Sequence, residues 1–461
     1  MENNYKFSRF NTYAENDSGE LLIYNSIEES NSMCKIRSRD ACLYKEAIAQ
    51  NNVNLLPKNQ IGLLMKRSMV VDNSEDELRK LEYYRIRVVT QVQQKNVLGI
   101  TILPTGKCNF RCEYCYENFH DGKMQQDVQD AIINFIRRKI IYHSGVSISW
   151  FGGEPLLELD TINYISRKVI AICDSLHRTY FASITTNGYL LTADVMKQLI
   201  KNRIFLYQIT LDGTSETHDK YRHLANGAPT FKKIESNLLE IKKTVKTGSI
   251  RITLRCNFTQ ESFNHTDEFA EWFKANFGDD RRFSIFVRTV GLYGDGGDNL
   301  SSVIMNDCGV GEICNSIFES ERNNNDCSNC RMANVSYLSL GACVCYAGMT
   351  NSYVFDPVGK VRKCTVALSE DYNIVGEIVN GEVVIDATAM AKWVVPRPMH
   401  EECFDCSFAG ACMDNVCHTN KAQGIENKWP NCPHEKFAVK SLLLWYDKYE
   451  QIKYIDENNR S

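Results

Sequence analysis

The sequence predicts an α/β protein built on an open, partial (β/α)6 barrel, with a smaller domain before it and a cysteine-rich domain after it. Between residues 96 and 325, six apolar runs alternate with stretches whose apolar residues recur at i, i+3 and i+4. This alternation is typical of parallel sheets with crossover helices, and six repeats are too few to close such a barrel. The strands are expected at 98–103, 146–151, 180–185, 205–211, 250–256 and 283–288.

Helical periodicity separates these strands. The helical pattern after the first strand places its apolar residues on one face, namely Val128, Ala131, Ile132, Phe135 and Ile136. Similar patterns run through 162–172 and 231–241. The polar groups at the carboxyl ends of the parallel strands are therefore expected to form the active site.

Composition limits the class of protein. The 461 residues predict roughly two to four domains, and a hydrophobic content of 43% is ample for packed cores. The net charge of −4, without a long basic block, does not favour nucleic acid as a partner. The N-terminus lacks a signal-peptide pattern, and no apolar run is long enough to span a membrane. We therefore expect a cytoplasmic protein without a membrane partner.

The first domain, 1–95, contains no recognisable chemistry. Strand-like runs at 10–13 and 21–24 precede helical patterns at 40–50, 59–67 and 74–82, the last opening with Ser74 and Glu77 in a capping-box arrangement. This order of strands and helices resembles the small winged-helix domain that recognises peptides in many peptide-modifying enzymes. A purely structural cap on the barrel is the alternative.

Three cysteines follow the first predicted barrel strand. Cys108, Cys112 and Cys115 have the spacing Cys-x3-Cys-x2-Cys, which suits an iron–sulfur cluster. Three ligands leave one iron of a four-iron cluster open to a substrate or cofactor. A zinc site would need a fourth ligand, for which His120 is a weak candidate, and three thiols cannot all pair as disulfides.

With Tyr114 before its last cysteine, this loop resembles the signature of the radical S-adenosylmethionine (SAM) enzymes. The resemblance implies that the reduced cluster binds SAM through its open iron and cleaves it to methionine and a 5′-deoxyadenosyl radical, which abstracts hydrogen from a carbon. It also implies a reductant such as flavodoxin or ferredoxin.

Further motifs fall at the ends of the next strands. Gly152, Gly153 and Glu154 follow the second strand, where the resemblance implies that they receive the amino group of SAM. It likewise implies that Ser183, before the Asn187-Gly188 turn, contacts the SAM ribose. Without the resemblance, these segments would be interpreted as ordinary turns.

The fourth and fifth strands also end in polar residues. Asp212 is expected near SAM, and Arg255 and Asn257 are weaker candidates. His218, Asp219 and Arg222 form a group for which a structural hydrogen-bonding role and a role in the site remain equally open.

The C-terminal third is rich in cysteine. Twelve of the nineteen cysteines lie from Cys308 onward, and their spacing over 326–436 resembles the SPASM domain, which holds two auxiliary four-iron clusters. A zinc ribbon is the less favoured alternative. A helix is expected at 437–461. By the resemblance, the outer auxiliary cluster takes four ligands, Cys403, Cys406, Cys412 and Cys432.

The inner auxiliary cluster would take Cys345, Cys364 and Cys417, although Cys417 follows Cys412 with one residue more than is usual. Its fourth ligand is open, because relatives have a cysteine where this chain has Ser339. The local alternatives are Cys343, Cys330 and Cys327. Otherwise one iron is free to bind a substrate thiolate.

The resemblance implies a maturase of ribosomally made peptides that binds a precursor with a leader sequence and forms a thioether or carbon–carbon crosslink. The alternative is an anaerobic sulfatase-maturing enzyme that oxidises Cys or Ser to formylglycine. That branch carries an aspartate base after the cysteine that corresponds to Cys364, where this chain has Thr365. An electron carrier without catalysis is a third hypothesis, disfavoured because it would need no SAM pocket.

Overall fold

The computed structural model describes most of the chain, and its description covers residues 4–29, 32–93, 96–117, 119, 122–259, 262–290, 338–341, 345–396, 399–413, 417–424, 432, 434–449 and 452–456. The expected loops at 291–299 and 323–326 lie outside these ranges. His120, Cys327, Cys330 and Cys343 lie outside them as well.

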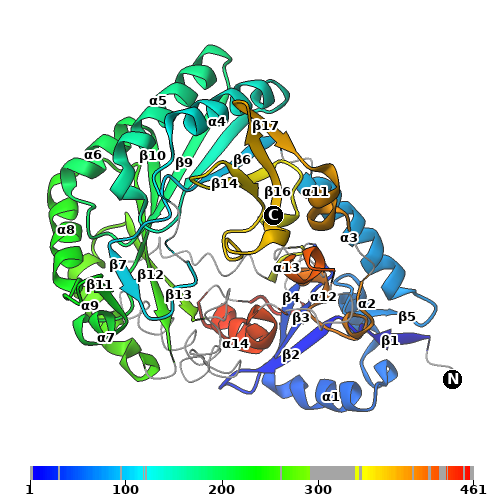
Figure 1. The fold of residues 1–461 in the computed structure, drawn as a ribbon. Helices are drawn as coiled ribbons and strands as arrows, with labels where there is room; N and C mark the ends of the chain where they lie inside the picture. The colour runs from blue at the N-terminus through cyan, green and yellow to red at the C-terminus, as the bar shows by residue number, and fades with distance from the viewer. Residues whose placement is uncertain are drawn as a thin grey trace.

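One large, mostly parallel sheet organises the molecule (Figure 1). Its strand order is β13-β12-β10-β9-β8-β6-β14-β15-β16-β17, so it is open at both ends. The six parallel strands expected from the sequence are present: β6 (Val97–Ile102), β8 (Gly145–Trp150), β9 (Thr179–Thr186), β10 (Ile204–Thr210), β12 (Arg251–Phe258) and β13 (Phe283–Thr289). The predicted α/β class and its parallel sheet are confirmed.

Helices cover the outer face of this sheet (Figure 1). They are α4 (Gln126–Lys139), α5 (Leu159–Ser175), α6 (Ala193–Lys201), α8 (Phe231–Thr244) and α9 (Thr266–Phe277). Alternate strand residues such as Ile148, Ile184 and Ile252 are fully or almost fully buried beneath them. The residues between these point to the inner face and are mostly polar, so this face is suited to a ligand rather than to a helix.

Two short strands fasten the cysteine loop after β6. β7 (Phe110–Cys112) pairs antiparallel with β11 (Arg222–Leu224), which follows α7 (Ser215–Tyr221). In this pairing Arg222 lies opposite Cys112. The loop is thereby tied to the segment after β10, more than a hundred residues along the chain.

The N-terminal segment forms a three-stranded antiparallel sheet, β2-β3-β4, and a separate strand pair, β1-β5. Its elements are β1 (Tyr5–Phe7), β2 (Asn11–Glu15), β3 (Leu21–Asn25), β4 (Met33–Ile36), α1 (Ser38–Ala49), α2 (Lys58–Met65), β5 (Val70–Asp72) and α3 (Glu77–Gln93). The predicted strands and helices are present. Whether this segment belongs to the winged-helix class stays a prediction.

The predicted capping box is wrong. The helix α3 begins at Glu77, and the Asp76 carboxylate accepts the backbone N–H of Arg79 as the cap. The buried Glu77 carboxylate instead accepts a hydrogen bond from Ser8 at 2.5 Å. The Glu77 side chain therefore makes a tertiary contact and does not cap its own helix.

The C-terminal part continues the barrel sheet. β14 (Ser352–Phe355) pairs in parallel with β6, and β15 (Lys360–Arg362) folds back on β14 as the expected hairpin. The remaining elements are β16 (Ile374–Val379), β17 (Glu382–Ile385), α11 (Ala387–Val394), α12 (Ala409–Cys412), α13 (Thr419–Ala422) and α14 (His434–Tyr449). The final helix is shorter than expected, because the described residues 452–456 are not helical.

The N-terminal sheet is packed on both faces. Leu21, Ile23 and Ile36 contact the core formed with α1 and α2, whereas Leu22 and Tyr24 pack against α14 and Phe408. Figure 1 shows α14 (red) beside β2 and β3 (blue). The two ends of the chain therefore share one apolar core.

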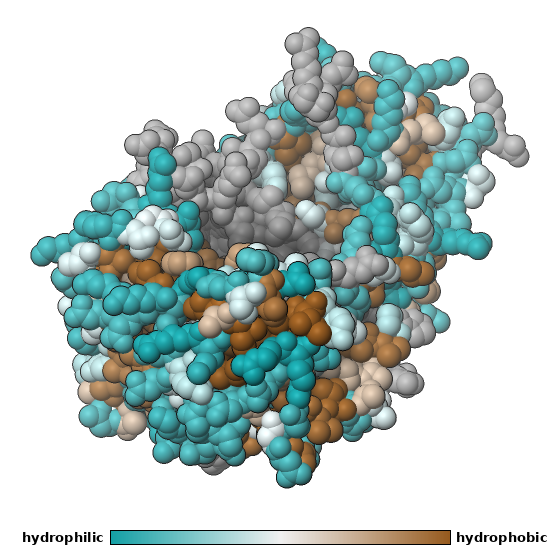
Figure 2. Space-filling model, turned by 90° about the horizontal axis from the view of Figure 1, so that it is seen from above, coloured by the Kyte–Doolittle hydropathy of each residue, from teal (hydrophilic) through white to brown (hydrophobic). Residues whose placement is uncertain are grey.

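The surface seen in Figure 2 is largely hydrophilic, with apolar patches scattered between charged side chains. Within the described residues, no helix combines the length and the apolar character needed to cross a bilayer.

A core substitution tests the join between β14 and the barrel. Phe355 is fully buried, and its ring centroid lies 5.6 Å from that of Phe135 on α4. Phe355→Ala should lower the free energy of unfolding by about 3–5 kcal/mol, because it removes the ring and leaves a cavity. Urea denaturation measures the loss. Val358→Ala, at a 58% exposed position in the next turn, is the control and should change stability by less than about 0.5 kcal/mol. Equal losses of stability in the two variants would contradict the packing of Phe355 against Phe135.

Candidate active site

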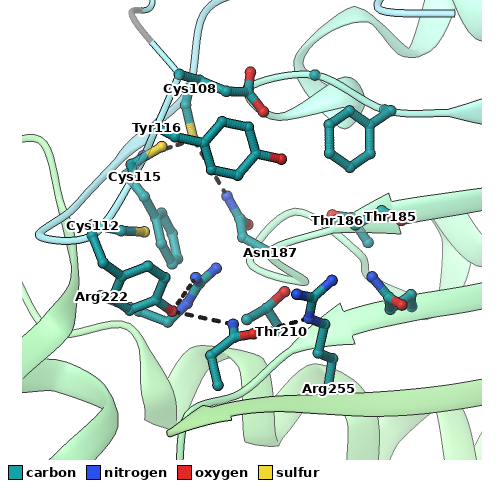
Figure 3. Close-up of a pocket in the computed structure, with 18 of the residues that line it drawn as sticks. Cys108, Cys112, Cys115, Tyr116, Thr185, Thr186, Asn187, Thr210, Arg222 and Arg255 are labelled. Carbon is teal, nitrogen blue, oxygen red and sulfur yellow. Dashed lines mark hydrogen bonds between the residues drawn. The ribbon is translucent and has the colours of Figure 1, made fainter. Parts of the chain in front are cut away.

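The three cysteines of the loop line one cavity of about 160 Å³. The cavity lies at the carboxyl ends of the parallel strands, where the sequence predicts the active site. In Figure 3 the sulfur atoms of Cys108, Cys112 and Cys115 gather on one side, and polar side chains from the strands lie opposite them. The spacing of the cysteines and the sheet topology together produce this grouping.

The strand ends supply the opposite wall. Gln208 and Thr210 come from β10, Arg255 and Asn257 from β12, and Thr185 from β9. These residues alternate along their strands and share the inner face. The sequence predicts Arg255 and Asn257 as candidates, and Thr210 opens the strand end that carries Asp212. Gln208 was not predicted, although a period-two pattern of polar residues within an apolar strand would have indicated it.

Aromatic and acidic groups complete the lining. Tyr114 lies just before the last cysteine, Tyr116, Glu117 and Phe119 come after it, and Phe151 precedes the two glycines. Burial, with a smaller contribution from the charge of Glu154, raises the pKa of Glu117 to about 7. Except for Tyr114, these lining residues were not predicted.

The two glycines let the cysteine loop approach β8. A Cβ on Gly153 would lie 2.4 Å from the carbonyl oxygen of Lys107, and Gly152 has a φ of +105° beside the carbonyl of Thr105. Only glycine can approach a neighbouring backbone as closely as Gly153 does or adopt the positive φ of Gly152 without strain. Both glycines line the cavity, so their small size serves the loop contact and the ligand space together.

Glu154 does not line the cavity, because its side chain is fully buried behind it. Its carboxylate accepts hydrogen bonds from Thr186 Oγ1 at 2.7 Å, from the Asn187 backbone N–H at 2.8 Å and from the Leu156 N–H at 3.0 Å. Its own backbone N–H donates to Lys107 O at 2.9 Å. Burial raises the pKa of Glu154, and these hydrogen bonds lower it. The residue therefore ties the loop to β9, and its contact with SAM stays a prediction.

Asn187 reaches the cysteine loop directly. Its side-chain Nδ2 donates to Asn109 Oδ1 at 2.8 Å and lies 3.9 Å from Cys108 Sγ. Ser183 lies deeper on the same strand, with its Oγ 3.1 Å from Ser149 Oγ, and is not part of the cavity lining. Asn187 is thus brought to the cysteines, whereas the predicted ribose contact of Ser183 stays a prediction.

Asp212 and Arg222 form a buried pair beside the cysteines. Arg222 Nε lies 3.8 Å from Asp212 Oδ2, and Tyr114 donates a hydrogen bond to this carboxylate. Asn257 adds its backbone N–H at 2.8 Å. Burial raises the pKa of Asp212 to about 6, although Arg222 acts in the opposite direction. Arg222 lines the cavity, but Asp212 lies behind it.

The group His218, Asp219 and Arg222 is largely structural. His218 Nδ1 accepts the backbone N–H of Asp212, so Nε2 carries the proton and donates to Thr230. Asp219 accepts the N–H groups of Thr230 and Phe231 at the start of α8. Arg222 alone reaches the cavity, where it donates to the Tyr114 hydroxyl at 2.9 Å.

The three thiols of the loop are better suited to bind a metal cluster than to remain as free cysteine side chains. Burial raises the pKa of Cys108 and Cys115 to about 12, so the thiols stay protonated unless a metal ion displaces the protons. Within the described residues, no three His, Cys, Asp or Glu side chains converge closely enough for a single metal ion. A cluster spaces its ligands further apart, because iron and sulfide atoms lie between them. The donor set therefore fits a cluster.

The C-terminal cysteines fall into two groups in space. Burial raises the pKa of Cys345 and of Cys364. Cys417 also raises both pKa values, and Cys345 raises that of Cys364, so these three side chains lie close enough to interact. Cys403, Cys406 and Cys432 instead surround Lys436. Cys406 and Cys412 both pack against the core cluster that includes Leu442 and Leu443 of α14. Ser339 is exposed, and Cys343 lies outside the described residues.

Arg222→Met tests the buried pair. Removing the cation leaves the Asp212 carboxylate buried without its partner, which should cost about 3–5 kcal/mol in urea unfolding. Adding Asp212→Asn should recover part of this loss, because both charges are then absent. Arg281→Met, on an exposed turn, is the control. A loss no larger than that of the control would show that the pair does not stabilise the site.

Gly153→Ala tests the approach of the loop to β8. The new methyl group meets backbone atoms that cannot rotate away, so the free energy of unfolding should fall by about 1–3 kcal/mol. Thermal unfolding measures the change. Gly248→Ala serves as the control, since no atom lies within 4 Å of a Cβ there. The close approach is disproved if the two variants melt alike.

Comparison with known proteins agrees with this geometry. Residues 102–270 match the radical SAM superfamily. A cysteine-type anaerobic sulfatase-maturating enzyme of Clostridium novyi (strain NT) is 23% identical over 380 residues, which cover 76% of this chain and 95% of the relative. The radical SAM cyclopropyl synthase TigE of Paramaledivibacter caminithermalis is 23% identical over 235 residues, 47% of each chain.

Among solved structures, native anSMEcpe with bound AdoMet and Cp18Cys peptide has a similar fold. The TM-score is 0.60 at 19% identity, and the match covers 77% of this chain and 100% of that chain.

Proposed function

Because residues 102–270 form a radical SAM domain and the chain is an enzyme of that superfamily, we propose that it is a peptide maturase. It binds a ribosomally made precursor peptide through a leader and forms a thioether or carbon–carbon crosslink. It uses SAM, one catalytic four-iron cluster and two auxiliary four-iron clusters. The observation that carries this proposal is the cavity lined together by Cys108, Cys112 and Cys115 and by polar strand ends.

The residues around the cavity have distinct tasks in this proposal. The catalytic cluster would supply one electron that cleaves SAM, and the resulting radical would abstract a hydrogen atom from the peptide. Asn187 and Arg222 stabilise negative charge on the cysteine sulfurs, one as a nearby amide donor and the other as a buried cation. Asn257 and Tyr114 hold Asp212 in place behind the site.

The two spatial groups of C-terminal cysteines support the auxiliary clusters. Cys345, Cys364 and Cys417 would hold the inner one, and Cys403, Cys406, Cys412 and Cys432 the outer one. Burial raises the pKa of cavity-lining Tyr116, and Tyr346, next to Cys345, makes a smaller contribution in the same direction, which supports a position of the inner group near the cavity. An auxiliary cluster there is suited to accept the electron that remains after bond formation. If its fourth position is open, a cysteine of the peptide can bind there.

A sulfatase-maturing activity is the second candidate. It is favoured by the Clostridium novyi relative, whose length the alignment almost fully covers. It is opposed by the residue after Cys364, which is Thr365 and carries no carboxylate. The Thr365 hydroxyl lies 2.9 Å from the Tyr346 hydroxyl, and burial raises the pKa of Tyr346, so this pair is a poor general base.

The cysteine assignment predicts a selective loss. Changing Cys108, Cys112 and Cys115 together to Ala should abolish formation of 5′-deoxyadenosine from SAM with dithionite, yet leave the iron of two clusters. Chromatography of the nucleoside and iron analysis of the reconstituted protein measure both effects. Cys42→Ala, at an exposed thiol in α1, is the control and should change neither. Nucleoside formation by the triple variant at the parent rate would refute the assignment.

Mass spectrometry of peptide products separates the two candidates. A crosslink removes two hydrogen atoms and creates no aldehyde, whereas the sulfatase-maturing reaction creates an aldehyde that reacts with a hydrazide. A hydrazide-reactive product from a cysteine peptide would favour the second candidate. Loss of two hydrogen atoms from a peptide whose gene lies next to the gene of this protein would favour the first candidate, the crosslink-forming maturase.

A further inference from the structure

Lys363 is a fully buried lysine, and among the described residues no carboxylate interacts with its charge. Its Nζ donates to the backbone oxygens of Met349 and Ser352, each at 2.6 Å. These two bonds satisfy the ammonium group as a donor but supply no negative charge. A charge buried without an opposite charge is costly, so the fold is expected to place an anion close to this side chain.

Both cations of the preceding strand, β15, do have carboxylate partners. Arg362 Nε lies 2.8 Å from Asp356 Oδ2, and Lys360 Nζ contacts the Glu377 carboxylate. Within the described part of the chain, Lys363 differs from these neighbours in having no such partner. The lack of a carboxylate is therefore a property of this buried position and not of the hairpin as a whole.

The charges near Lys363 belong to the inner cysteine group. Cys364 is the next residue along the chain. Burial lowers the pKa of Lys363, whereas the charge of Cys345 raises it. The effect is mutual, because burial raises the pKa of Cys345 and the Lys363 cation lowers it. Lys363 thus lies beside two of the proposed ligands of a negatively charged cluster.

Hydrogen-bond donors also point at the sulfurs of this group. The Cys345 sulfur accepts the backbone N–H of Ala347, and the Cys364 sulfur accepts those of Val366 and Ala367. Such N–H···S bonds stabilise negative charge on sulfur, and together with net charge and solvent exposure they set the reduction potential of an iron–sulfur cluster. The surroundings of these cysteines therefore fit the thiolate ligands of a cluster.

A buried asparagine fixes the chain between the lysine and the cysteine. Asn373 Oδ1 accepts the backbone N–H of Lys363 at 3.0 Å and that of Cys364 at 2.9 Å. Asn373 Nδ2 donates to Cys364 O at 2.8 Å and to Ala367 O at 2.9 Å. The cation and the cysteine are thereby held in one arrangement, as groups around a metal site usually are.

We propose that Lys363 is the counter-cation of the inner auxiliary cluster and raises its reduction potential, so that the cluster accepts the electron released when the new bond forms. In the proposed crosslinking, the peptide gives one hydrogen atom to the 5′-deoxyadenosyl radical, one proton to solvent and one electron to this cluster. The cluster then carries one more negative charge, which a buried cation stabilises. The inference rests on the proposed function, to which the auxiliary cluster belongs.

The test is a redox titration followed by electron paramagnetic resonance. It uses the reconstituted full chain with the three cysteines of the catalytic loop changed to Ala, and the signal that Cys345→Ala removes belongs to the inner cluster. At the parent's midpoint potential, Lys363→Met should lower the ratio of reduced to oxidised inner cluster at least about ten-fold, or about 59 mV for one electron. Lys360→Met is the control and should change this ratio less than about three-fold, because its partly exposed cation is screened. A Lys363→Met ratio no lower than that of the control would overturn the proposal.

Two further variants separate charge from hydrogen bonding. Lys363→Gln keeps donors for the two carbonyl oxygens but has no charge, whereas Lys363→Arg keeps the charge. Charge compensation predicts that Lys363→Gln lowers the potential as Lys363→Met does, and that Lys363→Arg restores most of the difference. A parent-like potential in Lys363→Gln would show that only the hydrogen bonds matter, and would overturn the proposal.

Iron analysis of each variant covers the loss of a cluster. Loss of the inner iron from Lys363→Met and Lys363→Gln, but not from Lys363→Arg, would support charge compensation, since the missing cation is what the two variants share. Loss from all three variants would assign Lys363 a structural role in the hairpin and overturn the proposal.

Formation of 5′-deoxyadenosine from SAM with dithionite is measured in parallel on the parent chain, with its catalytic cysteines intact. A lower potential in the Lys363 variants without SAM cleavage by the parent chain would refute the proposed function and leave the role of Lys363 standing. SAM cleavage without a shift in potential would refute the role of Lys363 alone. Absence of any auxiliary signal from the reconstituted chain would refute the inference together with the auxiliary clusters of the proposed function.

Discussion

The site depends on one buried glutamate that joins three separate pieces of chain. Glu154 fixes the cysteine loop through its backbone N–H and the end of β9 through its carboxylate, while Gly153 allows the two backbones to touch. The position of Cys108 relative to Asn187 follows from these contacts. A charge buried this deeply is tolerated because three donors satisfy it. Burial raises the pKa of Cys108, the Glu154 charge adds to this effect, and the Arg222 cation acts in the opposite direction.

The barrel was predictable because its physical signals are local. Each parallel strand is a short apolar run, and each covering helix repeats its apolar residues with the helical period. The cysteine loop, the two glycines and the Asn187-Gly188 turn each follow directly after a strand, so sheet topology alone brings them to one edge. For this reason Cys108, Gly153 and Asn187 line one cavity.

Other features depend on contacts between distant segments, which no local pattern reports. The contacts of Glu154 and Asp212 with SAM stay predictions, and in the structure both carboxylates accept backbone hydrogen bonds from other segments behind the cavity wall. For a similar reason, the Glu77 carboxylate accepts a hydrogen bond from Ser8 instead of capping its own helix. Nothing in the sequence of β4 indicates that its Lys35 will pair with Tyr454. Buried polar partners of this kind are chosen by the tertiary fold.

The pairing of β14 with β6 has a consequence for synthesis. About 250 residues separate these neighbours, so at ordinary rates of translation β6 emerges roughly 10–50 s before its partner exists. During that interval the strand that carries the cysteine loop has an open edge on one side, which is a hazard for aggregation. The first barrel strand can therefore be enclosed on both sides only after β14 in the cysteine-rich region has been synthesised.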